Sequence, residues 1–282
     1  MARVEIRCPS CQQKGYLEVS EEALKVVTRG LLAVNISDGT ICEHTFIAYV
    51  DRNLNIRDYF IADFKIELPE IPPTEEIKEK RIPSKDVINL DLIKLNLPAL
   101  LLTHVLKSIF SKQKVVILHD HEFLYNHIHN FFDYITADSF DDNIEIMNRE
   151  AYKKNKKMYK GHMVFEGNQI INNVDNLIED KKIKVEKQLI QTFLSETDLS
   201  YSYIMLKNEI HKAHKLATSI LEYANEQQIE KLTLKIIVDN ITETYNIKLH
   251  KTYLNFLIDI IISYFNVEVA ETADVADFLG FI

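Results

Sequence analysis

Lys114-Val115-Val116-Ile117-Leu118 is the run of residues that most constrains the fold of this chain. A continuous apolar run of this length predicts a strand buried on both faces. Helical patterns flank it over Leu97 to Phe110, where Pro98 is tolerated in the first turn, and over Glu122 to Ile135. Further strands are expected over Ile144 to Met147 and Met163 to Phe165. Residues 84–180 are therefore predicted to form an α/β domain.

Residues 1–68 have the pattern of a β-rich module with one sheet. Short strands are expected over Val4 to Arg7 and Tyr16 to Val19, around a tight turn from Cys8 to Gly15. Ser20 can cap a short helix that Gly30 ends. Three more strands complete the predicted order β-β-α-β-β-β, and they are Leu31 to Ile36, Thr45 to Val50 and Ile56 to Ile66.

Two boundaries divide the rest of the chain. Prolines and charged residues from Pro69 to Pro83 predict a linker over residues 69–83. From Lys181 onward the apolar spacing is helical, so residues 181–282 are predicted to be a helical region that ends in an acidic, apolar tail, Val267 to Ile282. The expected fold class is therefore mixed α/β (α+β), with a β-rich module, a central α/β domain and a helical C-terminal region.

The composition indicates in which cellular compartment the chain works and which ligands its charge disfavours. The chain has 282 residues, three cysteines and a formal net charge of -9. So few cysteines predict a reducing interior, and an acidic chain does not attract nucleic acid by its overall field. The first residues lack an apolar signal core, and the longest apolar stretch, Tyr253 to Phe265, is too short and polar to span a membrane. A cytoplasmic location is expected.

Cys8-Pro9-Ser10-Cys11 is the sharpest chemical signal in the sequence. Two thiolates separated by two residues on a turn can both reach one tetrahedral ion. Cys42 and His44 are the natural third and fourth ligands, because residues two apart on an extended strand share a face. A filled set of four ligands predicts a structural zinc site. In the alternative, Cys8 and Cys11 are two small apolar residues in a turn.

A second group of candidate ligands follows the buried strand. His119-Asp120-His121 lies where a strand of an α/β domain ends, which is where sites usually form. A metal-dependent enzyme that uses these three residues is one alternative function. Against it, His127 and His129 are two apart on a predicted helix and face different ways.

A basic run is a third candidate site. The run includes Tyr152 and Tyr159, and its lysines are Lys153, Lys154, Lys156, Lys157 and Lys160. Lysines with interleaved aromatics can hold phosphates or single-stranded nucleic acid, although such runs are more often solvated loops. Nucleic-acid binding is another alternative function, in which the helices expected between Leu234 and Phe265 would form a helix-turn-helix. The net negative charge of the chain counts against it.

The N-terminal quarter also carries a resemblance. The Cys8 to Cys11 turn and the segments Gly30 to Val34, Cys42 to Asp51 and Arg57 to Tyr59 resemble a group of uncharacterised archaeal proteins of the Asgard group. The predicted strand order of residues 1–68 is similar to longin domains. The helix, buried strand and helix from Leu100 to Ile135, with a helical end, resemble DENN-type regulators of small GTPases. Longin modules normally lack the Cys8/Cys11 turn.

Together these patterns favour a protein that binds other proteins over an enzyme. The sequence contains no P-loop, no nucleophile elbow, no zincin helix and no dinucleotide-binding glycine pattern. We expect an adaptor or regulator with a protein partner, which the resemblance implies to be a small GTPase or a membrane-traffic factor, and peripheral membrane contact stays open. The apolar end, Asp277 to Ile282, is expected to dock on this chain's own core or in a partner's groove.

Overall fold

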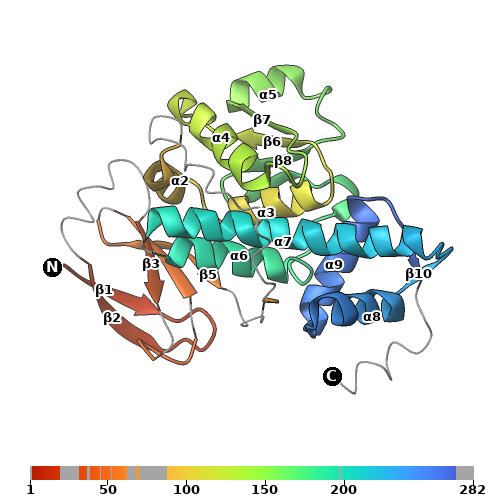
Figure 1. Ribbon diagram of the computed structural model, residues 1–282. Helices are drawn as coiled ribbons and strands as arrows, with labels where there is room; N and C mark the ends of the chain where they lie inside the picture. The colour runs from red at the N-terminus through yellow and green to blue at the C-terminus, as the bar shows by residue number, and fades with distance from the viewer. Residues whose placement is uncertain are drawn as a thin grey trace.

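The computed structural model describes residues 2–19, 32–36, 39–44, 46–51, 53–61, 68–69, 88–196 and 198–270. It confirms the mixed α/β class, with strand hairpins near the N-terminus and helices toward the C-terminus (Figure 1). Three expectations lie outside the described residues, and they are the helix between Ser20 and Gly30, most of the linker from Pro69 to Pro83, and the end of the chain from 271 to 282.

The strands and helices have these bounds. The strands are β1 (Ala2–Arg7), β2 (Lys14–Val19), β3 (Leu32–Ile36), β4 (Phe46–Val50), β5 (Ile56–Ile61), β6 (Val115–Leu118), β7 (Ile144–Met147), β8 (Met163–Glu166), β9 (Gln169–Asn172), β10 (Leu232–Thr233) and β11 (Val269–Ala270). The helices are α2 (Leu90–Asn96), α3 (Ala99–Phe110), α4 (Tyr125–Thr136), α5 (Arg149–Asn155), α6 (Lys184–Ser195), α7 (Leu199–Glu226), α8 (Leu234–Tyr245) and α9 (Lys251–Ser263), with short 3-10 turns at Glu122–Leu124 and Val174–Asn176.

The five N-terminal strands form two sheets, which corrects the expectation of one. Among the described residues β1 and β2 pair only with each other, and β3, β4 and β5 form a separate antiparallel sheet. The β1–β2 hairpin packs against one face of β4 through Phe46, Ala48 and Val50. The other face of β4 carries Ile47 and Tyr49 into the main core. β4 is thus buried on both sides, and the hairpin is a separate layer over it (Figure 1).

The central sheet has the order β7-β6-β8-β9, with β6 parallel to both neighbours. Its alternating side chains explain the continuous apolar run. Val115 and Ile117 face the main core, while Val116 and Leu118 face a smaller cluster with Tyr152 of α5. The prediction that β6 is buried on both faces is confirmed. The helix that covers its second face, α5, was not predicted.

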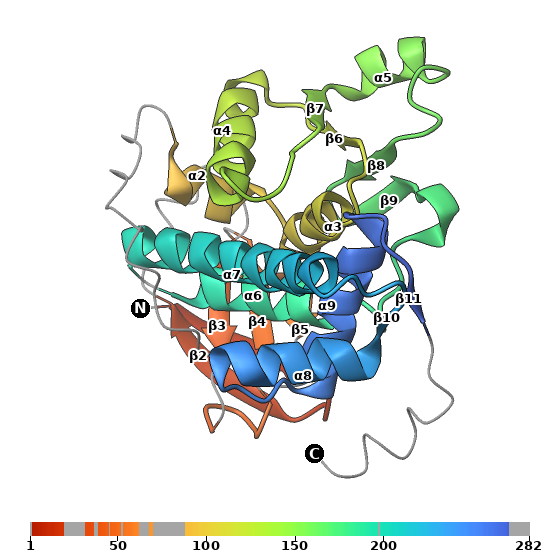
Figure 2. The ribbon, with the colours of Figure 1, turned by 45° about the vertical axis from the view of Figure 1, so that its right-hand side comes forward.

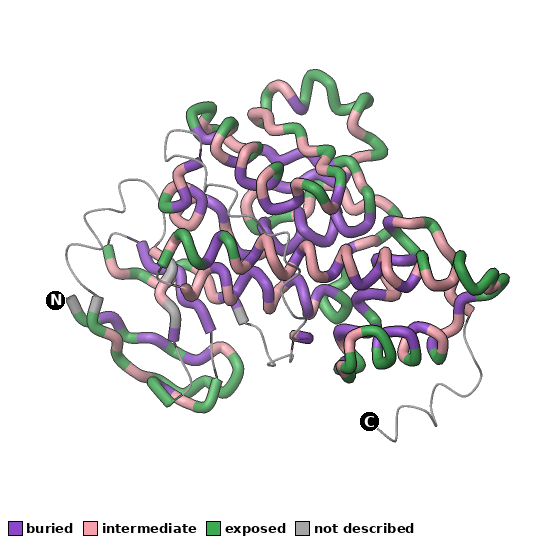
Figure 3. The backbone as a smooth tube through the Cα atoms, viewed as in Figure 1, coloured by how far each residue is buried: buried purple, intermediate pink, exposed green. Residues whose placement is uncertain are grey.

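Helices α6 and α7 lie at the centre of the molecule. α7, which is 28 residues long, runs across the middle of the structure and packs against α4, α6 and α9 (Figure 1 and Figure 2). α6 also packs against α3, so one hydrophobic core reaches from β4 and β5 to α9. Buried backbone therefore runs through the centre in Figure 3, while the β1–β2 hairpin and α5 lie at the rim. The predicted division into domains at residues 68, 83 and 180 stays a prediction.

Several predicted element boundaries move by a few residues. Pro98 is the N-cap of α3 rather than part of its first turn, and the helix expected from Glu122 opens as a 3-10 turn before α4. Among the described residues no single helix is long and apolar enough to cross a membrane. Only the pair α2 and α3, bent by 106° where they join, reaches that length and composition together.

Candidate metal centre

The first half of the candidate metal centre is the turn between β1 and β2. The Cys8 N–H donates to the Gln13 carbonyl at 2.8 Å, and the Gln12 N–H donates to the Cys8 carbonyl at 2.9 Å. These two bonds close the turn, with Gln12 in the left-handed region at φ +64°. The Cys8 side chain is buried and that of Cys11 is exposed. The turn is therefore fixed by its backbone, with one thiol facing inward and one at the surface.

The second half lies just before β4. Gly39 has φ +80° and donates its N–H to the Cys42 carbonyl at 2.9 Å, which makes a tight turn. Cys42 is half-buried, and its Sγ lies 3.6 Å from Nδ1 of His44. Glycine suits position 39 because a side chain is strained at this positive φ. The turn sets Cys42 and His44 beside each other at the start of the strand.

The two halves converge on one point. One ligand atom from each of Cys8, Cys11, Cys42 and His44 lies within 4.8 Å of the other three. Sulfur atoms bound to the same zinc ion at about 2.3 Å are about 3.8 Å apart in a tetrahedron, so a small contraction brings this set onto one ion. No other group of three or more such ligands occurs in the part of the chain that the structure describes. The four residues singled out in the sequence therefore form one cluster that fits a metal ion.

The thiols of the cluster influence one another electrostatically. Burial raises the pKa of Cys8, but N–H groups of the turn and the Cys42 side chain outweigh it, so the pKa of Cys8 lies below its ordinary value. Burial and the two neighbouring thiols raise the pKa of Cys42 to about 11. A thiolate at Cys8 or Cys11 thus opposes ionisation of the Cys42 thiol. A divalent cation removes this repulsion, because thiolates are the form that binds metal.

Gly15 holds the two halves at their spacing, a role that the sequence did not reveal. A Cβ at position 15 would lie 2.6 Å from Cγ1 of Ile41, the residue before Cys42. A Cβ at this position would therefore require the Ile41 side chain or the hairpin to shift, and glycine avoids this clash. The glycine after the Cys8 to Cys11 turn was visible in the sequence, but its contact with Ile41 depends on how the two sheets pack.

The cluster also joins two sheets between which the described part of the chain forms no backbone hydrogen bonds. Cys8 and Cys11 belong to the β1–β2 hairpin, while Cys42 and His44 precede β4 of the three-stranded sheet. Beneath them lies a small core, whose buried members are Val4, Ile6, Cys8, Ile36, Ile41, Phe46, Ala48 and Val50. So small a core contributes little stability by itself. A metal ion at this place therefore cross-links the hairpin to the rest of the molecule.

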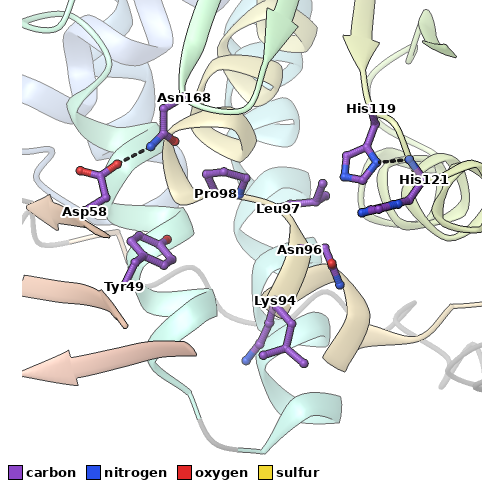
Figure 4. Close-up of a pocket in the computed structure, with 10 residues that line it drawn as sticks. Tyr49, Asp58, Lys94, Asn96, Leu97, Pro98, His119, His121 and Asn168 are labelled. Atoms are coloured by element: carbon purple, nitrogen blue, oxygen red, sulfur yellow. Dashed lines mark hydrogen bonds between the residues drawn. The ribbon is translucent and has the colours of Figure 1, made fainter. Parts of the chain in front are cut away.

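His119 and His121 lie at the carboxyl end of β6, as expected, and line a cavity of about 220 Å³ (Figure 4). Tyr49, Asp58 and Asn168 line the same cavity, and the Asn168 side-chain amide donates to the Asp58 carboxylate. The His121 N–H donates to Nδ1 of His119 at 3.1 Å, so that nitrogen carries no proton. Asp120 does not line the cavity. A metal site or an activity that uses His119 and His121 together with Asp120 stays a prediction.

The basic run stands apart from both sites. Lys153 and Lys154 form the last turn of α5, and Lys156, Lys157 and Lys160 follow it, all exposed. Tyr152 and Tyr159 point into the small core under the central sheet, and the Tyr159 hydroxyl donates to Glu145 at 3.0 Å. The aromatics of the run therefore pack inward. Anion binding by its lysines stays a prediction.

α8 and α9 confirm the two helices expected between Leu234 and Phe265. Asn246, in the left-handed region at φ +54°, ends α8, and His250 caps α9. α9 packs Tyr253, Leu257 and Ile260 into the main core. Nucleic-acid binding by this pair of helices stays a prediction.

No protein-family model matches the chain, and no curated protein is significantly similar to it in sequence.

Proposed function

We propose that the chain is a zinc-stabilised binding protein whose metal centre is structural and whose activity is the recognition of another protein. The observation that carries the proposal is the convergence of Cys8, Cys11, Cys42 and His44 within reach of one ion. Three thiolates and an imidazole are a donor set that zinc prefers, and four protein ligands leave no position for a substrate.

The β1–β2 hairpin supports the binding part of the proposal. A two-stranded hairpin is only marginally stable in water, so this one depends on its small core and on the proposed zinc. Its outward side chains are exposed, and they are Arg3, Glu5, Arg7, Lys14, Tyr16 and Glu18. The Arg3 guanidinium lies 4.2 Å from the ring centroid of Tyr16, whose side chain is 57% exposed. Arginine and tyrosine are the residue types that dominate binding surfaces.

The proposed partner surface is therefore the outer face of the hairpin. The partner class that the longin and DENN resemblances imply, a small GTPase or a membrane-traffic factor, belongs to this proposal.

Cobalt substitution tests the structural role of the metal. Co²⁺ in a closed site of three thiolates and one imidazole should give a tetrahedral absorption spectrum that azide and free imidazole leave unchanged. A spectrum that shifts when azide is added would reveal an open coordination position and would favour a catalytic metal.

A matched pair of variants tests the binding surface. Tyr16 and Tyr201 are equally exposed, at 57%, and Tyr201 belongs to α7 rather than to the hairpin. Partners captured by the wild-type chain should be lost with Tyr16→Ser and retained with Tyr201→Ser. Equal capture by both variants would rule out this surface. Turnover in an activity screen that disappears with His119→Ala, in a folded protein, would contradict the non-catalytic assignment.

A further inference from the structure

A hollow of about 460 Å³ lies between the segment before α6 and the start of α9. α6 and α9 pack against each other behind α7 (Figure 2), and residues from the first turn of each helix line the hollow. Four lysines line the hollow, and they are Lys181, Lys182, Lys184 and Lys251. We call this feature the lysine hollow. It is far in sequence from the cysteine cluster and shares no lining residue with the cavity at His119.

The charge balance of the lysine hollow is opposite to that of the whole chain. The chain carries a formal net charge of -9, yet Asp259 is the one carboxylate that lines the hollow. That carboxylate already accepts a hydrogen bond from the buried Lys107 Nζ at 3.1 Å. Within the described residues, Lys181 and Lys251 have no ion-pair partner. Lys182 is paired with Glu179 at 3.0 Å, so the positive charge that nearby acids leave uncompensated in the hollow is that of Lys181 and Lys251.

The backbone adds to this positive field. Lys184 is the first residue of α6, and Lys251 is the first residue of α9. Lysine at the start of a helix opposes the helix dipole, whose N-terminal end is itself positive. α9 has no acidic residue in its first turn, and the one in α6, Glu186, is fully buried 3.7 Å from Lys107. An anion in the hollow would relieve the repulsion that this arrangement creates.

We propose that the lysine hollow binds a phosphate-bearing ligand, either a soluble polyphosphate ester or the phosphorylated headgroup of a lipid. Its volume is that of a small-molecule site. Lysines supply charge to the phosphate oxygens, and the two helix ends supply oriented dipoles. Thr252 and Asn255 line the same hollow and bring polar groups beside the lysines, while Phe256 provides an apolar wall. The proposal is independent of the proposed zinc centre and of the hairpin surface.

Calorimetric titration of the full chain with pyrophosphate tests whether the hollow binds phosphate groups, which both proposed ligands carry. We expect binding at low salt that weakens steeply between about 50 and 200 mM salt. Lys181→Glu with Lys251→Glu should weaken it by about tenfold for each lysine, or about 100-fold together, because each removes one charged contact. Both side chains are exposed, so the unfolding temperature without ligand should stay that of the wild type.

The control is Lys231→Glu with Lys235→Glu, which makes the same change in net charge at two exposed lysines outside the hollow. It should leave pyrophosphate affinity within about twofold, since screened charges at a distance contribute little. If both double variants lost pyrophosphate affinity equally, net charge alone would explain the loss, and the proposal would be overturned. So would a loss seen only with Lys156→Glu and Lys157→Glu, which would place the site on the basic run after α5.

Vesicles distinguish the two sources of phosphate. Phosphatidylcholine vesicles that contain phosphatidylinositol 4-phosphate should sediment the wild-type chain if the ligand is a headgroup, and pure phosphatidylcholine vesicles should not. Pyrophosphate binding without sedimentation assigns a soluble ligand. A wild-type chain that binds neither pyrophosphate at low salt nor the charged vesicles contradicts the proposal.

Discussion

The cysteine cluster and the His119 to His121 segment are both histidine-bearing groups that the sequence marks as candidate metal sites, but their geometry differs. In the first, residues from two turns, about thirty positions apart, bring four ligand atoms within 4.8 Å of one another. In the second, three neighbours in sequence supply two rings whose centroids are 5.4 Å apart, and one ring nitrogen is already occupied by a backbone N–H.

The difference shows that adjacency in sequence is a poor guide to coordination. Consecutive residues on extended backbone point to opposite faces, so a His-Asp-His run does not present three ligands together. Two separate turns can each offer a pair of ligands to the same point. A site built from two separate turns, like the cysteine cluster, can form only when the sheets pack correctly, which couples the metal to the fold.

Cys8→Ser breaks the first site and should have the largest effect. Cys8 is the buried ligand, and its loss leaves three donors for the ion. We expect about one bound zinc per chain in the wild type and none in the variant. The free energy of unfolding of the N-terminal strands should fall by more than about 4 kcal/mol, a range in which loss of a metal is one of few mechanisms. Elemental analysis and denaturant unfolding measure both quantities.

The wild-type protein treated with a strong chelator is the matched comparison for Cys8→Ser. Its stability should fall to that of the variant, because both lack the same cross-link. A metal-free wild-type protein with undiminished stability would contradict the zinc assignment.

Gly15→Ala tests the packing of the two halves without touching a ligand. The added Cβ would meet Cγ1 of Ile41 at 2.6 Å, which displaces the turn that carries Cys42. Zinc affinity should fall by about tenfold or more, the effect typical of residues that position metal ligands. Gly161→Ala is the control, because nothing lies within 4 Å of its Cβ position. Competition with a chromogenic chelator gives both affinities, and equal values would show that Ile41 yields without moving Cys42.

Part of the metal centre and part of the fold could be predicted from the sequence, because they depend on short-range backbone geometry. Cys8 and Cys11 lie on a local turn, and Cys42 and His44 share a strand face, so each pair follows from short-range geometry. The meeting of the two pairs was predicted because the Cys8/Cys11 turn supplies only two of the four ligands that a structural zinc site needs. The separate pairing of β1 with β2 was missed, because sheet partners are chosen by long-range packing. α5 was missed because its lysines concealed the inward face that Tyr152 contributes.

Replacing His119 should leave the metal unchanged, which sharpens the contrast between the two groups. His119→Gln keeps a polar side chain at the wall of the cavity (Figure 4). We expect the zinc content to equal that of the wild type and the free energy of unfolding at neutral pH to change by about 1 kcal/mol or less, as for a partly exposed side chain. A loss of zinc with this variant would mean that the two groups are coupled or that His119 is itself a ligand.

The smallest expected effect is on the pH dependence of stability. Burial, with a smaller contribution from His121, lowers the pKa of His119, while Asp120 acts to raise it. The folded state therefore binds fewer protons at this site than the unfolded state does. Stability is full above the unfolded pKa of about 6.5 and declines as the pH falls through that value, because protonation of Nδ1 also removes its bond with the His121 N–H.

His119→Gln removes this one proton-binding difference. The wild type minus variant difference in unfolding free energy should therefore decrease as the pH is lowered from about 7.5 to about 5.5. Metal-free samples of both proteins are needed, because acid also displaces zinc from thiolates. A difference that stays constant over this range would show that His119 titrates alike in the folded and unfolded chains. The cavity would then be more hydrated than its geometry indicates.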